Sequence, residues 1–231
     1  MRLLDIIRAI MATKAAKTHV VKSLAVSNLI SLVLFGIRVV ATDSDRYWFL
    51  FWNLFLAWVP VLFAWLLIRR LKKESWKKFA PILLTILWFG FLPNSFYIMS
   101  DLIHLQSTGD INILFDTVLF LSCIWNGLVA GMLSLYWVHR AVSKRKGNDV
   151  GVIFVAAILL LTSFAIYLGR SLRWNTWDLI VHPAGIVFDV SERVVNPLTY
   201  PQAFLTTFTF FLLLGSIYYV MWNFVQALKR A

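Results

Sequence analysis

Long apolar stretches separated by short polar connections dominate the pattern of this chain. Six of them approach or exceed the roughly 20 mostly apolar residues that a helix needs to cross a bilayer. They cover residues 23–41, 47–68, 79–98, 112–138, 150–169 and 201–225. The pattern predicts an all-α fold: an integral membrane bundle of six transmembrane helices that forms a single domain over residues 23–231.

Residues 1–22 follow a different pattern and are expected to form a separate segment. Their apolar positions recur at helical spacing and alternate with basic residues. This is typical of an amphipathic helix that lies on the cytoplasmic face of a membrane, where basic side chains meet anionic lipid. A frayed basic tail is the alternative.

Composition and charge support the membrane class and exclude several kinds of function. The chain is 60% hydrophobic, whereas soluble domains are about 45–50% apolar. The net charge of +11 is concentrated in a few connections, so nucleic-acid binding is not indicated. Cys123 is the single cysteine, which excludes an intrachain disulfide and a cysteine-based zinc cluster.

The distribution of Lys and Arg predicts the orientation. Most of these 22 residues lie in the N-terminal segment, in the connections 69–78 and 139–149, and in the C-terminal tail. Basic residues stay on the cytoplasmic side of short loops, so both termini are predicted to be cytoplasmic. His19 and His139 lie in these basic stretches and are expected to be solvated.

Three segments near the predicted outer face concentrate polar residues. In FLPNSFYIMSDLIHL, residues 91–105, four polar side chains share an arc of about 80° if the α-helix continues through them. Such a stripe should face protein or a water-filled cavity. Its members are Asn94, Tyr97, Asp101 and His104.

The fourth apolar stretch repeats this arrangement. Asn112, Asp116, Cys123 and Asn126 share one face, and helix packing is the better interpretation for the last two. The small residues of the Gly127-x-x-x-Gly131 pattern that follows permit close helix approach.

The third segment is GRSLRWNTWDLIVHP, residues 169–183. It contributes Arg170, Arg173, Asn175, Asp178 and His182. The two arginines are expected to pair with Asp101, Asp116 or Asp178, or to bind an anion such as a lipid phosphate, which suits the planar guanidinium fork. His182 precedes Pro183, which favours a turn or extended backbone there.

The segments LPNSFYIMSDLIHL and GRSLRWNTWD resemble the two hallmark motifs of a bacterial family of polytopic membrane proteins that is known only as a domain of unknown function. The likeness covers most of the chain after residue 45. It implies a multi-pass protein of the bacterial cell membrane and implies no activity.

The leading hypothesis is an outward-facing site that binds or processes an anionic, lipid-linked headgroup. Asp101, His104 and Asp178 would be its acid–base groups. The residues expected to bind the anion are Arg170, Arg173, Asn94, Tyr97, Asn175 and Asp116. Asp101, His104, Asp178 and His182 also have the ligand chemistry of a divalent metal site. The alternatives are an ion-coupled transporter, a non-catalytic partner of another membrane protein, and a structural ion-pair network.

Overall fold

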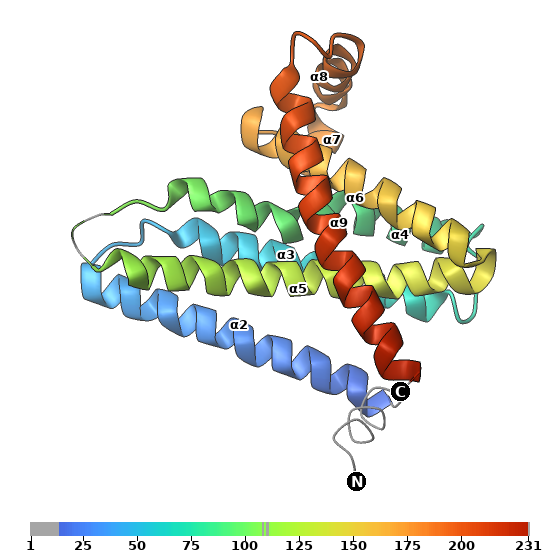
Figure 1. Ribbon diagram of the computed structural model, residues 1–231, viewed down its shortest axis with the longest axis horizontal. Helices are drawn as coiled ribbons and strands as arrows, with labels where there is room; N and C mark the ends of the chain where they lie inside the picture. The colour runs from blue at the N-terminus through green and yellow to red at the C-terminus, as the bar shows by residue number, and fades with distance from the viewer. Residues whose placement is uncertain (1–13, 108, 110, 231) are drawn as a thin grey trace.

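The computed structural model describes residues 14–107, 109 and 111–230, and these fold into helices without strands (Figure 1). In chain order the elements are α2 (Lys14–Thr42), α3 (Trp48–Arg70), α4 (Phe79–Tyr97), the 3₁₀ helix η1 (Ile98–His104), α5 (Ile113–Lys146), α6 (Asn148–Ser171), α7 (Asp178–Val181), α8 (Pro183–Val195) and α9 (Pro201–Arg230).

Six helices in the described part of the chain are long and apolar enough to cross a membrane, which confirms the six predicted spans. They are Val20–Thr42, Trp48–Arg70, Phe79–His104, Ile113–Lys146, Asn148–Ser171 and Pro201–Ala227. With 34 residues, α5 is about 51 Å long, which exceeds the roughly 30 Å of a bilayer hydrocarbon core. The fourth span therefore tilts or extends beyond the bilayer.

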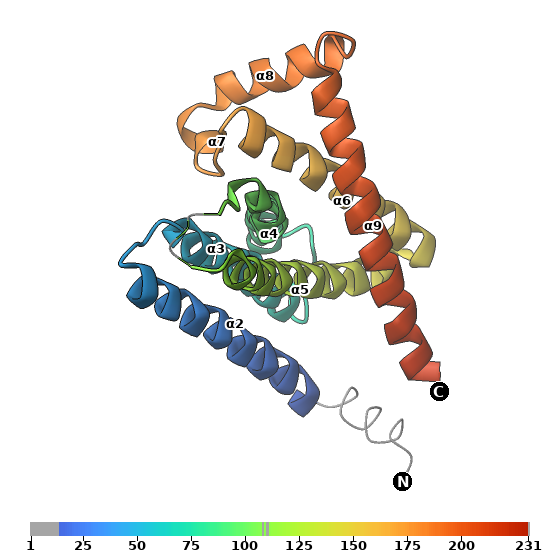
Figure 2. The ribbon, with the colours of Figure 1, turned by 60° about the vertical axis from the view of Figure 1, so that its left-hand side comes forward.

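Helix α5 occupies the centre of the fold, and α2, α3, α4 and α6 all pack against it. Helix α9 packs against α6 and crosses it at an angle (Figure 2). The largest core side chain is Trp88 on α4, which is fully buried together with Leu92 and Phe96. Helix α4 packs against α3, α5 and α6, and this packing places its C-terminal end and η1 beside the end of α6.

Two glycines of α5 explain how closely α4 approaches it. A Cβ atom at Gly131 would lie 2.6 Å from the Phe96 ring, and one at Gly127 would lie 2.7 Å from the Ser95 carbonyl oxygen. Real Cβ atoms do not tolerate such distances, so only glycine fits at these positions. The close packing predicted for the Gly127-x-x-x-Gly131 pattern is confirmed.

The long connection between the fifth and sixth spans contains two further helices, α7 and α8, which were not predicted. The turn expected before Pro183 is present, since His182 is non-helical and Pro183 begins α8. Trp174 anchors α8: its Nε1 donates to Asp189 Oδ2 at 2.7 Å, and its ring lies against Gly185. Val187 and Phe188, also on α8, are exposed.

The amphipathic segment predicted over residues 1–22 lies mainly outside the described residues. Its described part, from residue 14 onward, belongs to α2, which continues without a break into the first span. A second difference is that the α-helix does not continue through Asp101 and His104, because the chain tightens into η1 after Tyr97. Asp101 is buried and His104 is exposed, yet Tyr97, Asp101 and His104 all contact Arg170. Asp101 and His104 stay on one face because residues three apart eclipse in a 3₁₀ helix. Of the predicted stripe, Asn94 has a different partner, Thr176.

His139 is buried, which corrects the expectation that it is solvated. Its side chain is 2% exposed, and its Nδ1 lies 2.7 Å from the Tyr218 hydroxyl of α9. The basic residues that follow His139 belong to the last turns of α5, but His139 itself points toward α9, where its ring packs on Trp222. Local charge therefore did not reveal its environment.

Candidate functional site

Six polar or aromatic side chains meet where η1 lies beside the end of α6, and we call this set the Arg170 cluster. Its members are Asn53, Tyr97, Ser100, Asp101, His104 and Arg170. The packing of α6 against α4 brings Arg170, in the last turn of α6, next to η1. Gly169 permits this approach, since a Cβ atom there would lie 3.0 Å from Tyr97 Cε2.

An ion pair between Arg170 and Asp101 forms the centre of the cluster. Arg170 Nη2 lies 2.5 Å from Asp101 Oδ1, and Asn53 Nδ2 donates to Asp101 Oδ2 at 2.7 Å. Both carboxylate oxygens therefore have partners inside the protein. The Asp101 side chain is 2% exposed and that of Arg170 is 19% exposed, so only the cationic partner reaches the surface. Of the pairings predicted for the two arginines, that of Arg170 with Asp101 is present, whereas Arg173 forms no ion pair among the described residues.

The remaining contacts fix the plane of the Arg170 guanidinium. Its Nε and Nη2 donate to Ser100 Oγ at 2.9 and 2.7 Å, and its Cζ lies 4.3 Å from the centroid of the Tyr97 ring. Nη1 lies 2.9 Å from His104 Nε2. Because arginine can only donate, His104 Nε2 accepts this bond, and the neutral ring carries its proton on Nδ1. Phe49 packs edge-on against the same ring, with centroids 5.3 Å apart.

The turn after α6 carries other residues that the sequence indicated. Asn94 Nδ2 on α4 donates to Thr176 Oγ1 at 3.0 Å, which ties the turn to the bundle. Asp178 Oδ2 accepts the backbone N–H of Asn175 at 2.7 Å and closes the turn locally. Arg173 is exposed and has a left-handed backbone with φ 61°. Asn94, Asn175 and Asp178 thus position this turn, and Arg173 projects from it.

The four side chains considered as metal ligands do not form a cluster. Among the residues that the structure describes, no group of three or more His, Cys, Asp or Glu side chains is placed to hold a metal ion. Asp101 is turned inward to its ion pair, and Asp178 closes the turn of its own segment. His104 and His182 are exposed at separate elements, η1 and the α7–α8 junction.

Asp116 is not among the side chains that contact Arg170 and pairs with Arg38 instead. Arg38 Nε on α2 lies 2.8 Å from Asp116 Oδ1 on α5, and the two side chains are 0% and 1% exposed. Arg38 Nη1 also donates to the Ser44 carbonyl at 3.3 Å, and its Cζ lies 4.3 Å from the Tyr47 ring centroid. The buried pair joins the first span to the fourth.

Three residues of these clusters were missed at the level of sequence. Arg38 is the one charged residue of the first apolar stretch, and a charge in a span indicates a buried partner without naming it. Asn53 is likewise the one amide of the second stretch and carried a similar signal. Ser100 carried none, because serine is common at helix ends regardless of function.

The helices and buried ion pairs together define a polytopic α-helical membrane protein. The chain belongs to the family described as "Protein of unknown function (DUF1361)", whose model matches residues 52–217. This range contains every member of the Arg170 cluster, whereas Arg38 lies outside it. The predicted membership of a family without an assigned activity is confirmed, and the family match assigns no function. No curated protein and no solved structure matches the chain.

Proposed function

We propose that this protein binds the anionic headgroup of a lipid-linked molecule at the Arg170 cluster, on the outer side of the bacterial cell membrane. One observation carries the proposal: Arg170 is fixed by Asp101, Ser100 and Tyr97, yet 19% of its side chain stays exposed. An arginine that is already ordered binds a phosphate with little further loss of side-chain entropy.

The cluster leaves donors available to an anion. Arg170 has five N–H groups, and its four hydrogen bonds leave one on Nη1. The Nδ1–H of exposed His104 is a second donor. Arg173 adds a second positive charge three residues after Arg170. Asp101 acts in this proposal as a positioning residue, because both of its oxygens are already engaged.

Exposed apolar side chains on η1 and α7, the elements that follow α4 and α6, favour a ligand that remains attached to the membrane. Leu102 and Ile103 follow Asp101 on η1 and are exposed, as are Leu179 and Ile180 on α7. A soluble anion gains nothing from this apolar surface, whereas a lipid tail does. Any acid–base chemistry on the headgroup falls to His104, whose imidazole is exposed at the edge of the cluster.

The charge distribution supports the orientation that the proposal requires. The segments 69–78 and 139–149 hold ten of the basic residues. The first runs from the end of α3 to the start of α4, and the second covers the last turns of α5 and the start of α6. The opposite ends of these helices carry η1 and α7. Under the positive-inside rule the Arg170 cluster then faces outward, with both termini in the cytoplasm.

A non-catalytic partner of another membrane protein is the second candidate function, because most hydrogen-bonding groups of the cluster already have internal partners.

An ion-coupled carrier receives no comparable support from the polar residues deeper in the bundle. The polar residues Asn28 and Asn126, deeper in the bundle, bond to each other at 3.2 Å. Ser31 Oγ and Trp58 Nε1 complete this network at 2.9 and 3.0 Å, which agrees with the predicted packing role of Asn126.

Binding of a lipid phosphate monoester tests the proposal. The purified protein in detergent is titrated with phosphatidic acid and, separately, with diacylglycerol, which has no phosphate. Arg170→Lys keeps the charge but loses the fork, so we expect phosphatidic acid affinity to fall at least tenfold. Arg46→Lys is the matched control, since Arg46 is an exposed arginine that bonds Gln106 instead of the cluster.

Two results would refute headgroup binding at this site. One is equal affinity of the wild-type protein for phosphatidic acid and diacylglycerol. The other is a loss in Arg170→Lys no larger than in Arg46→Lys. Melting temperatures of both variants show whether the fold is intact, and an intact Arg170→Lys protein with unchanged binding leaves the partner-protein candidate.

A further inference from the structure

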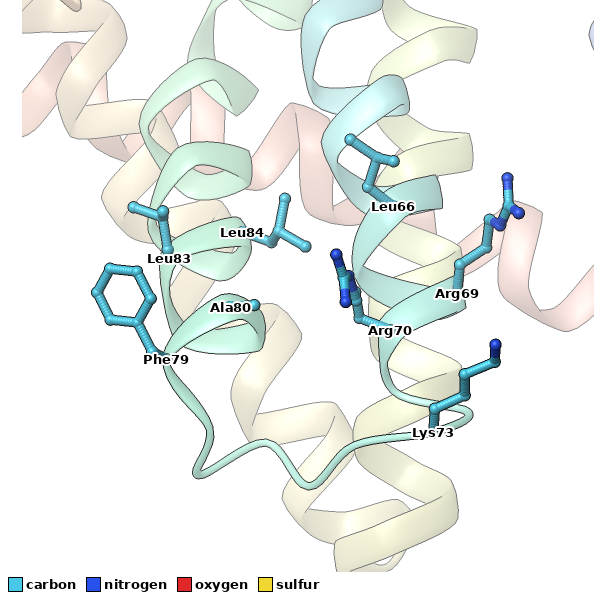
Figure 3. Close-up of a pocket in the computed structure, with 8 residues that line it drawn as sticks. All are labelled: Leu66, Arg69, Arg70, Lys73, Phe79, Ala80, Leu83 and Leu84. Atoms are coloured by element: carbon cyan, nitrogen blue, oxygen red, sulfur yellow. The ribbon is translucent and has the colours of Figure 1, made fainter.

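A groove opens between α3 and α4 at the end of the bundle opposite to the Arg170 cluster (Figure 3). Its volume is about 510 Å³, which lies within the roughly 300–1,000 Å³ typical of ligand sites. It is basic at its mouth and apolar along its walls. The lining residues are Leu66, Arg69, Arg70, Lys73, Phe79, Ala80, Leu83 and Leu84.

The order of residues along α3 and α4 gives the groove one basic end and one apolar end. Leu66 and Arg70 are four residues apart and therefore share one face of α3. On α4, Ala80 and Leu84 are related in the same way. In Figure 3 the Arg70 side chain extends from α3 toward α4, with Leu84 above Ala80 on the other helix. The small Ala80 leaves space near the basic mouth, and the leucines lie deeper.

The charges at the mouth are only partly compensated. Arg70 Nη1 lies 3.1 Å from Glu74 Oε1, but both side chains are substantially exposed, so water screens this pair. Arg69 is held against the Trp65 ring, with its Cζ 4.5 Å from the centroid. Lys73 has no ion-pair partner among the described residues. Three cations thus meet a single carboxylate, and no acidic side chain lines the groove.

We propose that this groove holds one anionic glycerophospholipid from the cytoplasmic leaflet. The lipid phosphate contacts Arg70 and Lys73, while an acyl chain lies along Leu66, Leu83 and Leu84. Charge complementarity identifies the headgroup as anionic, since basic pockets between membrane helices on the cytoplasmic side bind anionic headgroups. The leucines that line the groove, of which Leu83 is exposed and Leu66 and Leu84 are partly buried, identify the ligand as a lipid, because a free phosphate has nothing to place there.

Lipid binding to matched charge variants tests this site. The double variant Arg70→Gln/Lys73→Gln removes two charges from the groove. The control Lys77→Gln/Lys78→Gln removes two exposed charges from the same connection without touching the lining. Native mass spectrometry and melting curves with phosphatidylglycerol, phosphatidylcholine or glycerol 3-phosphate measure what each protein binds.

The wild-type protein and the Lys77→Gln/Lys78→Gln control should retain one phosphatidylglycerol in preference to phosphatidylcholine. The Arg70→Gln/Lys73→Gln protein should bind it at least tenfold more weakly, which corresponds to about 1.4 kcal/mol. Equal losses in both double variants would attribute binding to the general charge of the connection and overturn the proposal. So would a lack of preference for phosphatidylglycerol, or displacement of it by glycerol 3-phosphate.

This inference stands independently of the function proposed for the Arg170 cluster. Arg170→Lys should leave phosphatidylglycerol retention at the groove unchanged. Conversely, Arg70→Gln/Lys73→Gln should leave the Arg170-dependent binding of phosphatidic acid in place. The two proposals therefore fail or succeed separately.

Discussion

Replacing Asp116 with asparagine should destabilise the protein strongly, because it leaves Arg38 charged and buried without a counter-ion. The two side chains are 0% and 1% exposed, and Arg38 Nε lies 2.8 Å from Asp116 Oδ1. Asparagine keeps the size of the side chain and one oxygen that accepts this hydrogen bond. The substitution therefore isolates the loss of charge from a change in packing.

The expected magnitude follows from the geometry of the pair. At 2.8 Å and an effective dielectric constant of about 20, the attraction amounts to about 6 kcal/mol. Part of it is offset by the desolvation of both groups, and breaking a buried pair costs about 3–5 kcal/mol. Arg38 cannot escape by losing its proton. Its Nη2 lacks a hydrogen-bond partner among the described residues, and the acceptors of Nη1, Thr42 and Ser44, are neutral, so no second negative charge compensates.

Thermal unfolding of the detergent-purified protein measures this effect. A loss of about 3–5 kcal/mol in a chain of this length lowers the melting temperature by roughly 6–20 °C. Asp149→Asn is the matched control, since Asp149 is an exposed residue in the first turn of α6, where a carboxylate contributes at most about 1 kcal/mol.

A double substitution tests whether the unpaired charge of Arg38, and not the change of side chain at position 116, causes the loss of stability. Replacing both partners, as Arg38→Met/Asp116→Leu, removes both buried charges and should recover most of the stability that Asp116→Asn loses, since apolar replacements of buried pairs are often neutral. The electrostatic reasoning is refuted if Asp116→Asn unfolds at the same temperature as Asp149→Asn. It is also refuted if the double variant is no more stable than Asp116→Asn.

Two further predictions concern packing and orientation. Gly131→Ala should lower stability by about 1–3 kcal/mol in thermal unfolding, because its Cβ atom would lie 2.6 Å from an aromatic ring of α4, whereas Gly36→Ala, with open space around it, should be close to neutral; equal effects would contradict the observed approach of α4 to α5. In a background without the native cysteine, a cysteine at Lys144 should be protected from an impermeant thiol reagent in intact cells and one at Gln106 should react. The reverse labelling would move the Arg170 cluster to the cytoplasmic side.

The sequence by itself determined the helical class and the positions of the six spans. A spanning helix satisfies its own backbone hydrogen bonds, so its presence depends on a local apolar run and not on its neighbours. The same locality explains why the role of Gly131 was predictable: a small residue one turn from another marks a close contact whichever helix supplies the partner. Periodicity also placed Asp116 and Asn126 correctly on a buried face of the fourth span.

Only the tertiary structure decided which polar groups meet. Asp101 and Asp116 had the same candidate partners, yet one pairs with Arg170 of α6 and the other with Arg38 of α2. The choice depends on which helix packs against which. A charged residue in an apolar stretch shows by itself that a counter-charge is needed. The packing of whole helices decides which residue supplies the counter-charge, and no short segment of the sequence encodes this choice.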